Sequence, residues 1–333
     1  MMRKSLTIIT PCYNEEENVE TCYQATKSVM ETALPGYDYE HIFTDNASSD
    51  RTYAVLKTLA AQDKRIKLIR NSRNIGALGN IFNALAFASG DATVVMLPAD
   101  LQDPPEVIPE FVHHWENGAK IVYGIRTHRQ EAWWLRTGRR IYYTLVRKFS
   151  NVQLIPDAGE FQLIDRLVLD EIKQVDDYYP YVRGLVARTA MPYACVPYRW
   201  GVRKKGLSKA TLMVLIDQAL NGIISSSKTP IRVCIFLGVL CSALSLLYAV
   251  LGLLLSIIFY GSAPAGIPTL IVAQFFFNGL ILFFFGILGE YVSAIHEQVR
   301  RGPAMIPLDL VNFTPEIMQQ AQLPPRLRAQ RHA

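Results

Sequence analysis

Charged residues are absent from one long part of this chain. No Asp, Glu, Lys, Arg or His occurs between Val233 and Gly289, although charged residues make up 19% of the 333 residues. A helix that crosses about 30 Å of hydrocarbon needs only about 20 apolar residues, so this part is too long for one ordinary core helix. A buried hairpin in a soluble protein is the alternative, but soluble cores seldom run so long without charge. We expect the chain to fold back on itself within a membrane.

A cluster of helix breakers divides this apolar part into two arms. The segment Gly261-Ser-Ala-Pro-Ala-Gly-Ile-Pro268 separates arms at about 231–259 and 268–289, each long enough to span a bilayer. Basic residues flank only the outer ends of the arms, at Lys228, Arg232, Arg300 and Arg301. The positive-inside rule therefore predicts a two-helix hairpin with both chain ends in the cytoplasm.

Cysteine is scarce and unpatterned. The five cysteines include no CxxC pair, and two of them lie in the first arm, which argues against a metal cage or a disulfide framework. No GxGxxG follows the first predicted strand and no GxxxxGK[ST] occurs, so dinucleotide and P-loop sites lack support. The apolar run Leu6–Thr10 is too short for a signal peptide, which predicts that the polar part stays in the cytosol.

The net charge of +5 is modest, but basic residues gather with Trp and Tyr at Arg126–Lys148 and Arg199–Lys209. Such mixtures suit nucleic acid as well as anionic headgroups. Because they accompany a membrane hairpin, we expect the lipid surface as the partner, and no nucleic acid.

Strand and helix patterns alternate along the polar part. Predicted strands are Leu6–Thr10, Tyr39–Thr44, Ile66–Arg70, Ala92–Leu97 and Lys120–Tyr123, and predicted helices are Glu15–Met30, Asp50–Asp63, Ile81–Ser89 and Pro105–Asn117. This alternation predicts an α/β domain with a doubly wound, mostly parallel sheet. Ligands of such sheets bind beyond the carboxyl ends of the strands.

Polar segments follow the first four predicted strands. They are Pro11 to Glu15, Asp45 to Asp50, Asn71 to Gly76, and Pro98 to Glu106. Each alone is compatible with turns or helix caps, whereas four at one sheet edge favour a binding site. Asp100, Gln102 and Asp103 offer hard oxygen ligands that suit Mg²⁺ or Mn²⁺ beside a diphosphate. Asp103 also fits a helix cap before two prolines, and the sequence leaves both roles open.

Six segments together resemble the polyprenyl-phosphate glycosyltransferases, within family 2 of the glycosyltransferases. They are TPCYNEEEN, TDNASSD, ADLQDPPE, DAGEFQLIDR, RKKGLSK and GEYVSAIHEQVRRGP, in this order. The resemblance implies a GT-A fold, a nucleotide-sugar donor with UDP the more frequent nucleotide, a divalent cation, and a long-chain prenyl phosphate acceptor. It also makes a homo-oligomer plausible.

The resemblance further implies roles for residues at the matching positions. The nucleoside pocket would be lined by Pro11, Tyr13, Glu15 and Asp45, with Asn74 and Gly76 close by. Asp100 and Gln102 would hold the metal and the diphosphate, with Asp103 as a further candidate ligand. The catalytic face would carry Asp157 and Glu160 in addition to Asp100. Phosphates of the donor or acceptor would meet Arg126, Arg203, Ser208 and Lys209.

Two positions depart from the family pattern. Members usually carry Asp-x-Asp before Leu-Gln, but here Pro98 occupies the first position and Asp100 alone remains. The pattern Asp-x-Gly-Asp/Cys-Phe appears with Glu160, which lengthens one acidic side chain. Either change could tune the choice of sugar.

The expected reaction is an inverting displacement that yields a polyprenyl-phosphate-linked monosaccharide for cell-envelope glycan or lipopolysaccharide modification. The expected organisation is a cytosolic GT-A domain (1–210), an interfacial amphipathic helix (211–229), a transmembrane hairpin (230–290) and a cytosolic tail (291–333), making a multi-pass protein of the cytoplasmic membrane. One alternative is a processive polysaccharide synthase, disfavoured by Val196 where such enzymes carry Gln or Arg. A second is a catalytically silent nucleotide-sugar-binding scaffold, which Pro98 makes conceivable.

Overall fold

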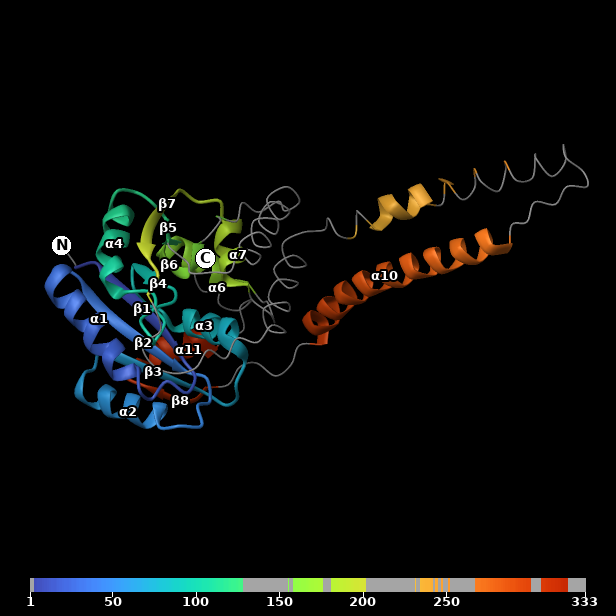
Figure 1. Ribbon diagram of the computed structural model, residues 1–333. Helices are drawn as coiled ribbons and strands as arrows, with labels where there is room; N and C mark the ends of the chain where they lie inside the picture. Colours follow the sequence, from blue (N-terminus) through green and yellow to red (C-terminus); the bar gives the residue numbers. More distant parts are fainter. Residues whose placement is uncertain are drawn as a thin grey trace, which may run out of the picture.

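The computed structural model describes residues 3–127, 155, 158–175, 181–201, parts of 231–251, 267–300 and 307–322. Their core is an eight-stranded sheet in the order β7-β5-β6-β4-β1-β2-β3-β8 (Figure 1). The strands are β1 (Ser5–Cys12), β2 (Asp38–Asp45), β3 (Ile66–Asn71), β4 (Ala92–Val94), β5 (Ile121–Thr127), β6 (Ala158–Asp165), β7 (Tyr193–Arg199) and β8 (Pro307–Val311). Only β6 and β8 run antiparallel to their neighbours. This confirms the predicted mostly parallel sheet.

Helices cover both faces of the sheet (Figure 1). One face carries α1 (Val19–Ala33), α2 (Thr52–Gln62), η1 (Pro105–Val107) and α4 (Ile108–Glu116), and the other carries α3 (Gly76–Phe87), α6 (Arg166–Lys173), α7 (Val182–Arg188) and α11 (Pro315–Gln322). Successive strand residues point to opposite faces, so Ile8 packs in the first hydrophobic cluster and Ile9 in the second. The predicted doubly wound arrangement follows from this two-sided burial.

The predicted elements match the observed ones except at some ends. The strand predicted at Ala92–Leu97 ends at Val94, although the residues after it keep single hydrogen bonds to the same two neighbouring strands, β6 and β1. Val95 donates to the carbonyl of Gln162 at 2.9 Å, whereas Leu97 donates to that of Ile9 at 2.8 Å. The helix predicted from Ile81 begins earlier, at Gly76.

Residues 307–322 belong to the sheet domain, whereas the sequence predicts a cytosolic tail at 291–333. Strand β8 pairs antiparallel with β3, with Asp309 opposite Arg70. Asn312 then donates to the carbonyls of Ala60 at 2.7 Å and Ile66 at 2.8 Å, and Phe313 packs against Phe87. An unpaired edge exposes backbone donors and acceptors, and β8 satisfies those of β3.

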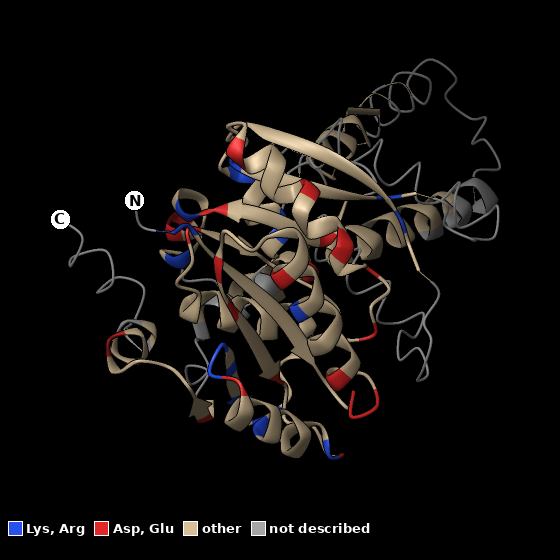
Figure 2. Ribbon diagram, turned by 90° about the vertical axis from the view of Figure 1, so that its left-hand side faces the viewer, with Lys and Arg blue, Asp and Glu red and all other residues tan. Residues whose placement is uncertain are grey.

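One helix among the described residues is long and apolar enough to cross a membrane. Helix α10 (Ile267–Arg300) extends away from the sheet domain (Figure 1) and contains this segment at Phe276–Ser293. Figure 2 shows Lys, Arg, Asp and Glu distributed over the sheet domain. At about 1.5 Å per residue, the 34 residues of α10 exceed the about 30 Å thickness of a hydrocarbon core. The predicted second arm is thus helical, and it continues past its predicted end.

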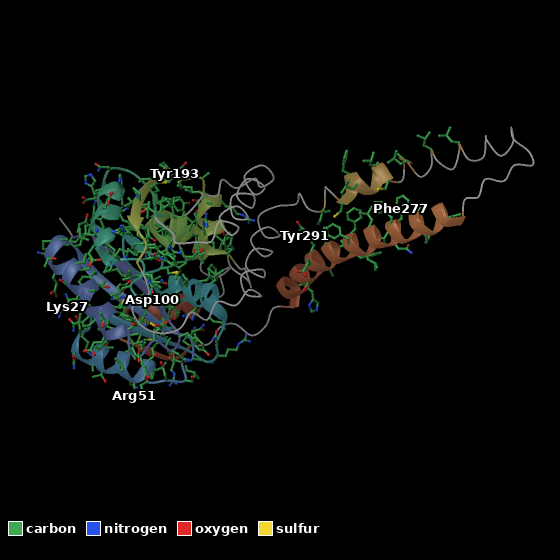
Figure 3. All side chains as sticks on the ribbon, in the orientation of Figure 1. Lys27, Arg51, Asp100, Tyr193, Phe277 and Tyr291 are labelled. Carbon is green, nitrogen blue, oxygen red and sulfur yellow. The ribbon has the colours of Figure 1, made fainter. Side chains whose placement is uncertain are left out.

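The predicted first arm is described only in part. Residues 234–241 are helical, and Phe277 and Tyr291 of α10 lie on the side of α10 that faces this stretch (Figure 3). The predicted turn at 261–268 is described only at its last two residues, which begin α10. The predicted interfacial helix at 211–229 lies outside the described residues. The structure therefore does not confirm the two-helix hairpin, which stays a prediction.

Candidate active site

The loops after β1 and β2 are joined by hydrogen bonds between their polar residues. The backbone N–H of Asn14 donates to Ser48 Oγ at 2.9 Å, and that of Ser49 donates to Asn14 Oδ1 at 2.8 Å. The N–H of Glu15 donates to Thr52 Oγ1 at 2.8 Å. The polar segments after two neighbouring strands thus form one surface, as the sequence predicts.

Left-handed backbone conformations recur in these loops. Asn14, Ala47 and Leu101 have φ values of 54°, 59° and 55°, and Gly76 has a φ of 75°. A residue with a side chain is strained in this region, at a cost of about 1–3 kcal/mol. Three strained positions at the carboxyl ends of β1, β2 and β4 are typical of a functional site, because the surrounding structure must hold them.

Asp45 is a fully buried carboxylate at the end of β2. Its Oδ1 accepts a hydrogen bond from the N–H of Ser48 at 3.3 Å, while its Oδ2 lies 3.7 Å from Nε of Arg70. Neither Oδ2 nor that Nε has a hydrogen-bond partner. Burial raises the pKa of Asp45, against the opposing effects of Ser48 and Arg70. The two side chains thus form an ion pair at the end of β2, and its polar atoms keep unused hydrogen-bonding capacity.

Sequence reasoning missed Arg70 at this place. Arg70 lies at the end of β3, directly opposite Asp45 of β2. The sequence shows that Arg70 ends a strand, but the contact with Asp45 follows only once β2 is known to pair with β3.

The remaining predicted nucleoside residues lie at the same edge. Pro11 pairs with Thr44 near the end of β1, and the Tyr13 side chain is 37% exposed. Glu15 Oε2 accepts a hydrogen bond from Asn18 Nδ2 at 2.6 Å, next to the start of α1. Pro11, Tyr13 and Asp45 thus remain consistent with a ligand surface, whereas Glu15 also has a local structural contact.

An asparagine network holds the loop between β3 and α3. Asn46 Nδ2 donates to Asn74 Oδ1 at 2.9 Å, and the same Oδ1 accepts from the N–H of Gly76 at 2.9 Å. Asn46 Oδ1 accepts from the N–H of Ile75 at 3.1 Å. The predicted residues Asn74 and Gly76 are therefore held by Asn46, which sequence reasoning did not single out.

The network continues into the core through Asn80. Its Oδ1 accepts from Asn71 Nδ2 at 2.7 Å and from Thr44 Oγ1 at 2.6 Å, and its Nδ2 donates to the Thr44 carbonyl at 2.9 Å. Asn80 is buried, so these bonds replace the water that its amide loses.

The predicted metal loop is joined to the end of β7. Gln102 accepts a hydrogen bond on its carbonyl from the N–H of Gly201 at 2.8 Å, and its own N–H donates to Asp100 Oδ1 at 3.2 Å. Figure 3 places Asp100 within the sheet domain. Among the described residues, no three His, Cys, Asp or Glu side chains gather to hold a metal.

Asp103 and Arg126 were predicted in separate roles, and the structure pairs them with each other. Asp103 is fully buried. Its Oδ1 accepts from Arg126 Nε at 3.0 Å and from the Tyr198 hydroxyl at 2.5 Å, and its Oδ2 accepts from Arg126 Nη2 at 2.6 Å. Both oxygens are thus engaged inside the protein. This geometry departs from the predicted metal-ligand role of Asp103.

The Arg126 guanidinium is held from several sides. Trp200 lies with its ring centroid 5.2 Å from Cζ. A Cβ on Gly159 would lie 3.1 Å from the same atom, so a larger residue there would require the guanidinium to shift by a few tenths of an ångström.

Burial and two arginines have opposite effects on Glu160. Burial raises the pKa of Glu160, whereas the positive charges of Arg183 and Arg126 lower it. Its Oε2 has no hydrogen-bond partner. A buried carboxylate with an unpaired oxygen suits contact with a substrate hydroxyl or a proton. Asp157, Arg203, Ser208 and Lys209 lie outside the described residues.

The family assignment follows from comparison with known proteins. The pattern of the family described as Glycosyl transferase family 2 matches residues 7–173. The chain belongs to this family.

Two relatives and one solved structure illustrate what this glycosyltransferase is similar to. An uncharacterized glycosyltransferase, YkcC, of Bacillus subtilis (strain 168) is 34% identical over 301 residues, which cover 90% of this chain and 92% of the relative. A bactoprenol glucosyl transferase of Shigella phage SfII is 32% identical over 302 residues, covering 90% and 96%. The mannosyltransferase PcManGT from Pyrobaculum calidifontis, solved in complex with GDP-Man and Mn²⁺, is 15% identical with a TM-score of 0.44, covering 90% and 88%.

Proposed function

We propose that this glycosyltransferase moves one sugar from a nucleotide-sugar donor to a membrane polyprenyl phosphate. The observation that carries the proposal is the presence, in one chain, of a polar site at the carboxyl ends of β1 to β4 and of the lipid-length helix α10. The relative named as a bactoprenol glucosyl transferase aligns over 90% of this chain, including both parts.

The donor would bind with its base near Asp45 and its diphosphate near Asp100. Asp45 Oδ2 and Arg70 Nε lack hydrogen-bond partners, and such a pair can accept from a base N–H and donate to a base carbonyl. Uracil offers both groups, and so does guanine, so the pair suits UDP as well as GDP. The family resemblance favours UDP. Pro11, Tyr13, Asn74 and Gly76 border this end of the site.

Asp100 and Gln102 suit a divalent cation that would also be coordinated by the phosphates of the donor. Asp100 and Gln102 supply oxygen atoms of the kind that Mg²⁺ and Mn²⁺ prefer. Mg²⁺ in particular is often bound by one or two protein carboxylates together with substrate phosphates. When bound, the cation would stabilise the charge that grows on the leaving diphosphate.

The chemical step we propose is an inverting displacement at the anomeric carbon. A phosphate oxygen of the acceptor forms the new bond to this carbon, while the bond to the nucleoside diphosphate breaks. A phosphate monoester is largely ionised at neutral pH because its second pKa is about 6, so it needs no strong base. Asp157 and Glu160 would orient the acceptor or bind a sugar hydroxyl. Arg126, Arg203, Ser208 and Lys209 would bind the phosphates.

The sheet topology supports a second membrane crossing. Strands β7 and β8 lie in one sheet, although α10 separates them along the chain. If α10 crosses the bilayer once, the segment between Gly201 and Ile267 must cross an odd number of times for the chain to return. A two-helix hairpin with both ends in the cytoplasm is the simplest solution, and it places the site beside the lipid headgroups.

The test is product analysis with the full chain in bilayers. A panel of UDP-sugars and GDP-mannose is offered with undecaprenyl phosphate and Mg²⁺ or Mn²⁺, and the lipid product is weighed by mass spectrometry. We expect a lipid that carries one sugar, lost in Asp100→Ala and kept in Glu110→Ala, whose carboxylate is exposed on α4.

Other products would contradict the proposal in identifiable ways. A polymer would indicate a processive polysaccharide synthase. Donor binding without any transfer, over the whole panel, would indicate a scaffold.

A further inference from the structure

The strand that follows the membrane helix contacts the donor end of the site. Asp309 lies on β8 directly opposite Arg70 of β3. Its Oδ2 accepts a hydrogen bond from the Tyr53 hydroxyl of α2 and lies 3.5 Å from Lys57 Nζ. Asp309 thus touches two helix residues while its strand closes the sheet.

Tyr53 connects Asp309 to the ion pair formed by Arg70 and Asp45. Its ring supports the Arg70 guanidinium, with Cζ 4.2 Å from the ring centroid. Nε of the same arginine lies 3.7 Å from Asp45 Oδ2. An arginine side chain has several rotatable bonds, so its approach to Asp45 depends on the surface on which it lies.

The position of β8 is itself well determined. Asn312 makes hydrogen bonds to the carbonyls that end α2 and begin β3, at 2.7 and 2.8 Å, and it accepts one from Lys64 at 3.2 Å. Phe313 packs against Phe87 of α3 with ring centroids 5.2 Å apart. Asp309 is therefore presented to Tyr53 from a rigid element.

We infer that Asp309 is a positioning residue of the donor site, which holds Tyr53 so that Arg70 faces Asp45. The inference rests on the proposed function, because it takes Asp45 and Arg70 as the place of the donor base. It adds that a residue beyond the membrane helix sets the affinity for the nucleotide.

Binding of UDP to the full chain in detergent, measured by calorimetry with Mg²⁺, tests the inference. Asp309→Ala and Tyr53→Phe both remove the hydrogen bond between these side chains, and Asp309→Ala also removes the exposed contact with Lys57. Each should weaken binding about fivefold, equivalent to about 1 kcal/mol. The double variant should be no weaker than the single ones, because both remove the same bond. Asp309→Asn keeps an accepting oxygen and should restore much of the affinity.

The control is Leu308→Ala, which changes an exposed side chain on the same strand and should leave affinity unchanged. A purely structural role would lower the melting temperature and alter kcat as well as the donor KM. The inference predicts a change in donor KM, with acceptor KM and kcat kept and the melting temperature lowered by no more than about 2–4 °C, the effect of one lost hydrogen bond.

Two results would be decisive against it and can be told apart. Equal UDP affinity in the wild type, Asp309→Ala and Tyr53→Phe would overturn the inference alone. A wild type that binds neither UDP nor GDP would overturn the proposed function as well. Tyr53→Phe keeps the ring, so it remains informative if Asp309→Ala does not fold.

Discussion

At the residue scale, the pairing of Asp103 with Arg126 changes the role that we propose for both. Asp103 directs both carboxylate oxygens to the Arg126 and Tyr198 side chains, and none of its surface is exposed. A buried arginine without its carboxylate would be costly, since truncating one partner of such a pair typically costs about 3–5 kcal/mol. We propose that Asp103 orients Arg126 for an acceptor phosphate, and that the cation is left to Asp100 and Gln102.

Asp103→Asn should separate this role from metal binding. The amide keeps the shape and one accepting oxygen but loses the charge that orients Arg126, so we expect acceptor KM to rise about tenfold, equivalent to about 1.4 kcal/mol. The Mn²⁺ concentration for half-maximal activity should not change. This concentration should rise in Asp100→Asn and in Gln102→Ala, because both residues are proposed to hold the cation. Steady-state kinetics measure all three variants.

A higher Mn²⁺ requirement in Asp103→Asn would show that Asp103 is a metal ligand after all. An unchanged acceptor KM in Asp103→Asn would contradict the proposed role of Asp103 in binding the acceptor.

At the element scale, buried amides join β2 and β3 to α3 and so determine the shape of the loop that carries Asn74. Asn80, inside α3, bonds to Thr44 and Asn71, and Asn46 bonds to the loop itself. Amide side chains can donate and accept together, which lets one residue connect two strands and a helix.

Asn80→Ala should destabilise the sheet domain and loosen this loop. The change removes three hydrogen bonds and leaves Thr44 Oγ1 without its partner, at a cost of about 1–3 kcal/mol for an unsatisfied group. Asn71 Nδ2 keeps only its bond to Asn46 Oδ1 at 3.3 Å. We expect a lower melting temperature and a higher donor KM.

Asn83→Ala is the matched control, because Asn83 is partly buried and donates only one bond, to Asn71. It should cost about 1 kcal/mol. Equal losses in the two variants would contradict the central position of Asn80.

At the scale of the whole molecule, the chain leaves the sheet domain and later returns to complete it. Residues 307–322 supply β8 and α11, which pack on β3 and α3. The part that we propose to lie in the membrane is thus an insertion within the domain rather than an anchor at its end. We propose that the acceptor reaches the site where this insertion begins and ends.

Two shortened chains should behave differently for this reason. A chain cut after residue 230 lacks β8 and α11, so the edge of β3 is exposed and we expect aggregation and loss of UDP binding. A chain in which a flexible Gly/Ser linker replaces 231–300 keeps both elements and should bind UDP. It should lose most transfer to undecaprenyl phosphate in bilayers, as measured by lipid product. UDP binding by the first chain at wild-type affinity would contradict the structural role of β8.

The sequence by itself determined the features that depend on local pattern. The uncharged run from Val233 to Gly289 predicts a lipid-spanning part, and α10 has the length and composition for it. Alternating apolar runs predict five strands at nearly their observed positions, because burial repeats with the period of each element. Since parallel strands end at one edge, the polar segments after them could be grouped before the structure was known.

Only the tertiary structure decided which side chains meet. Asp103 and Arg126 are 23 residues apart, and Asp309 and Tyr53 are 256 apart. Such contacts depend on strand order and register, which no short pattern encodes: β8 reaches Tyr53 because it pairs with β3, and Asp103 meets Arg126 because the loop after β4 lies beside the end of β5. The same carboxylates could bind a cation or an arginine, and the fold selects between them by burial and by the partner that it brings within hydrogen-bond distance.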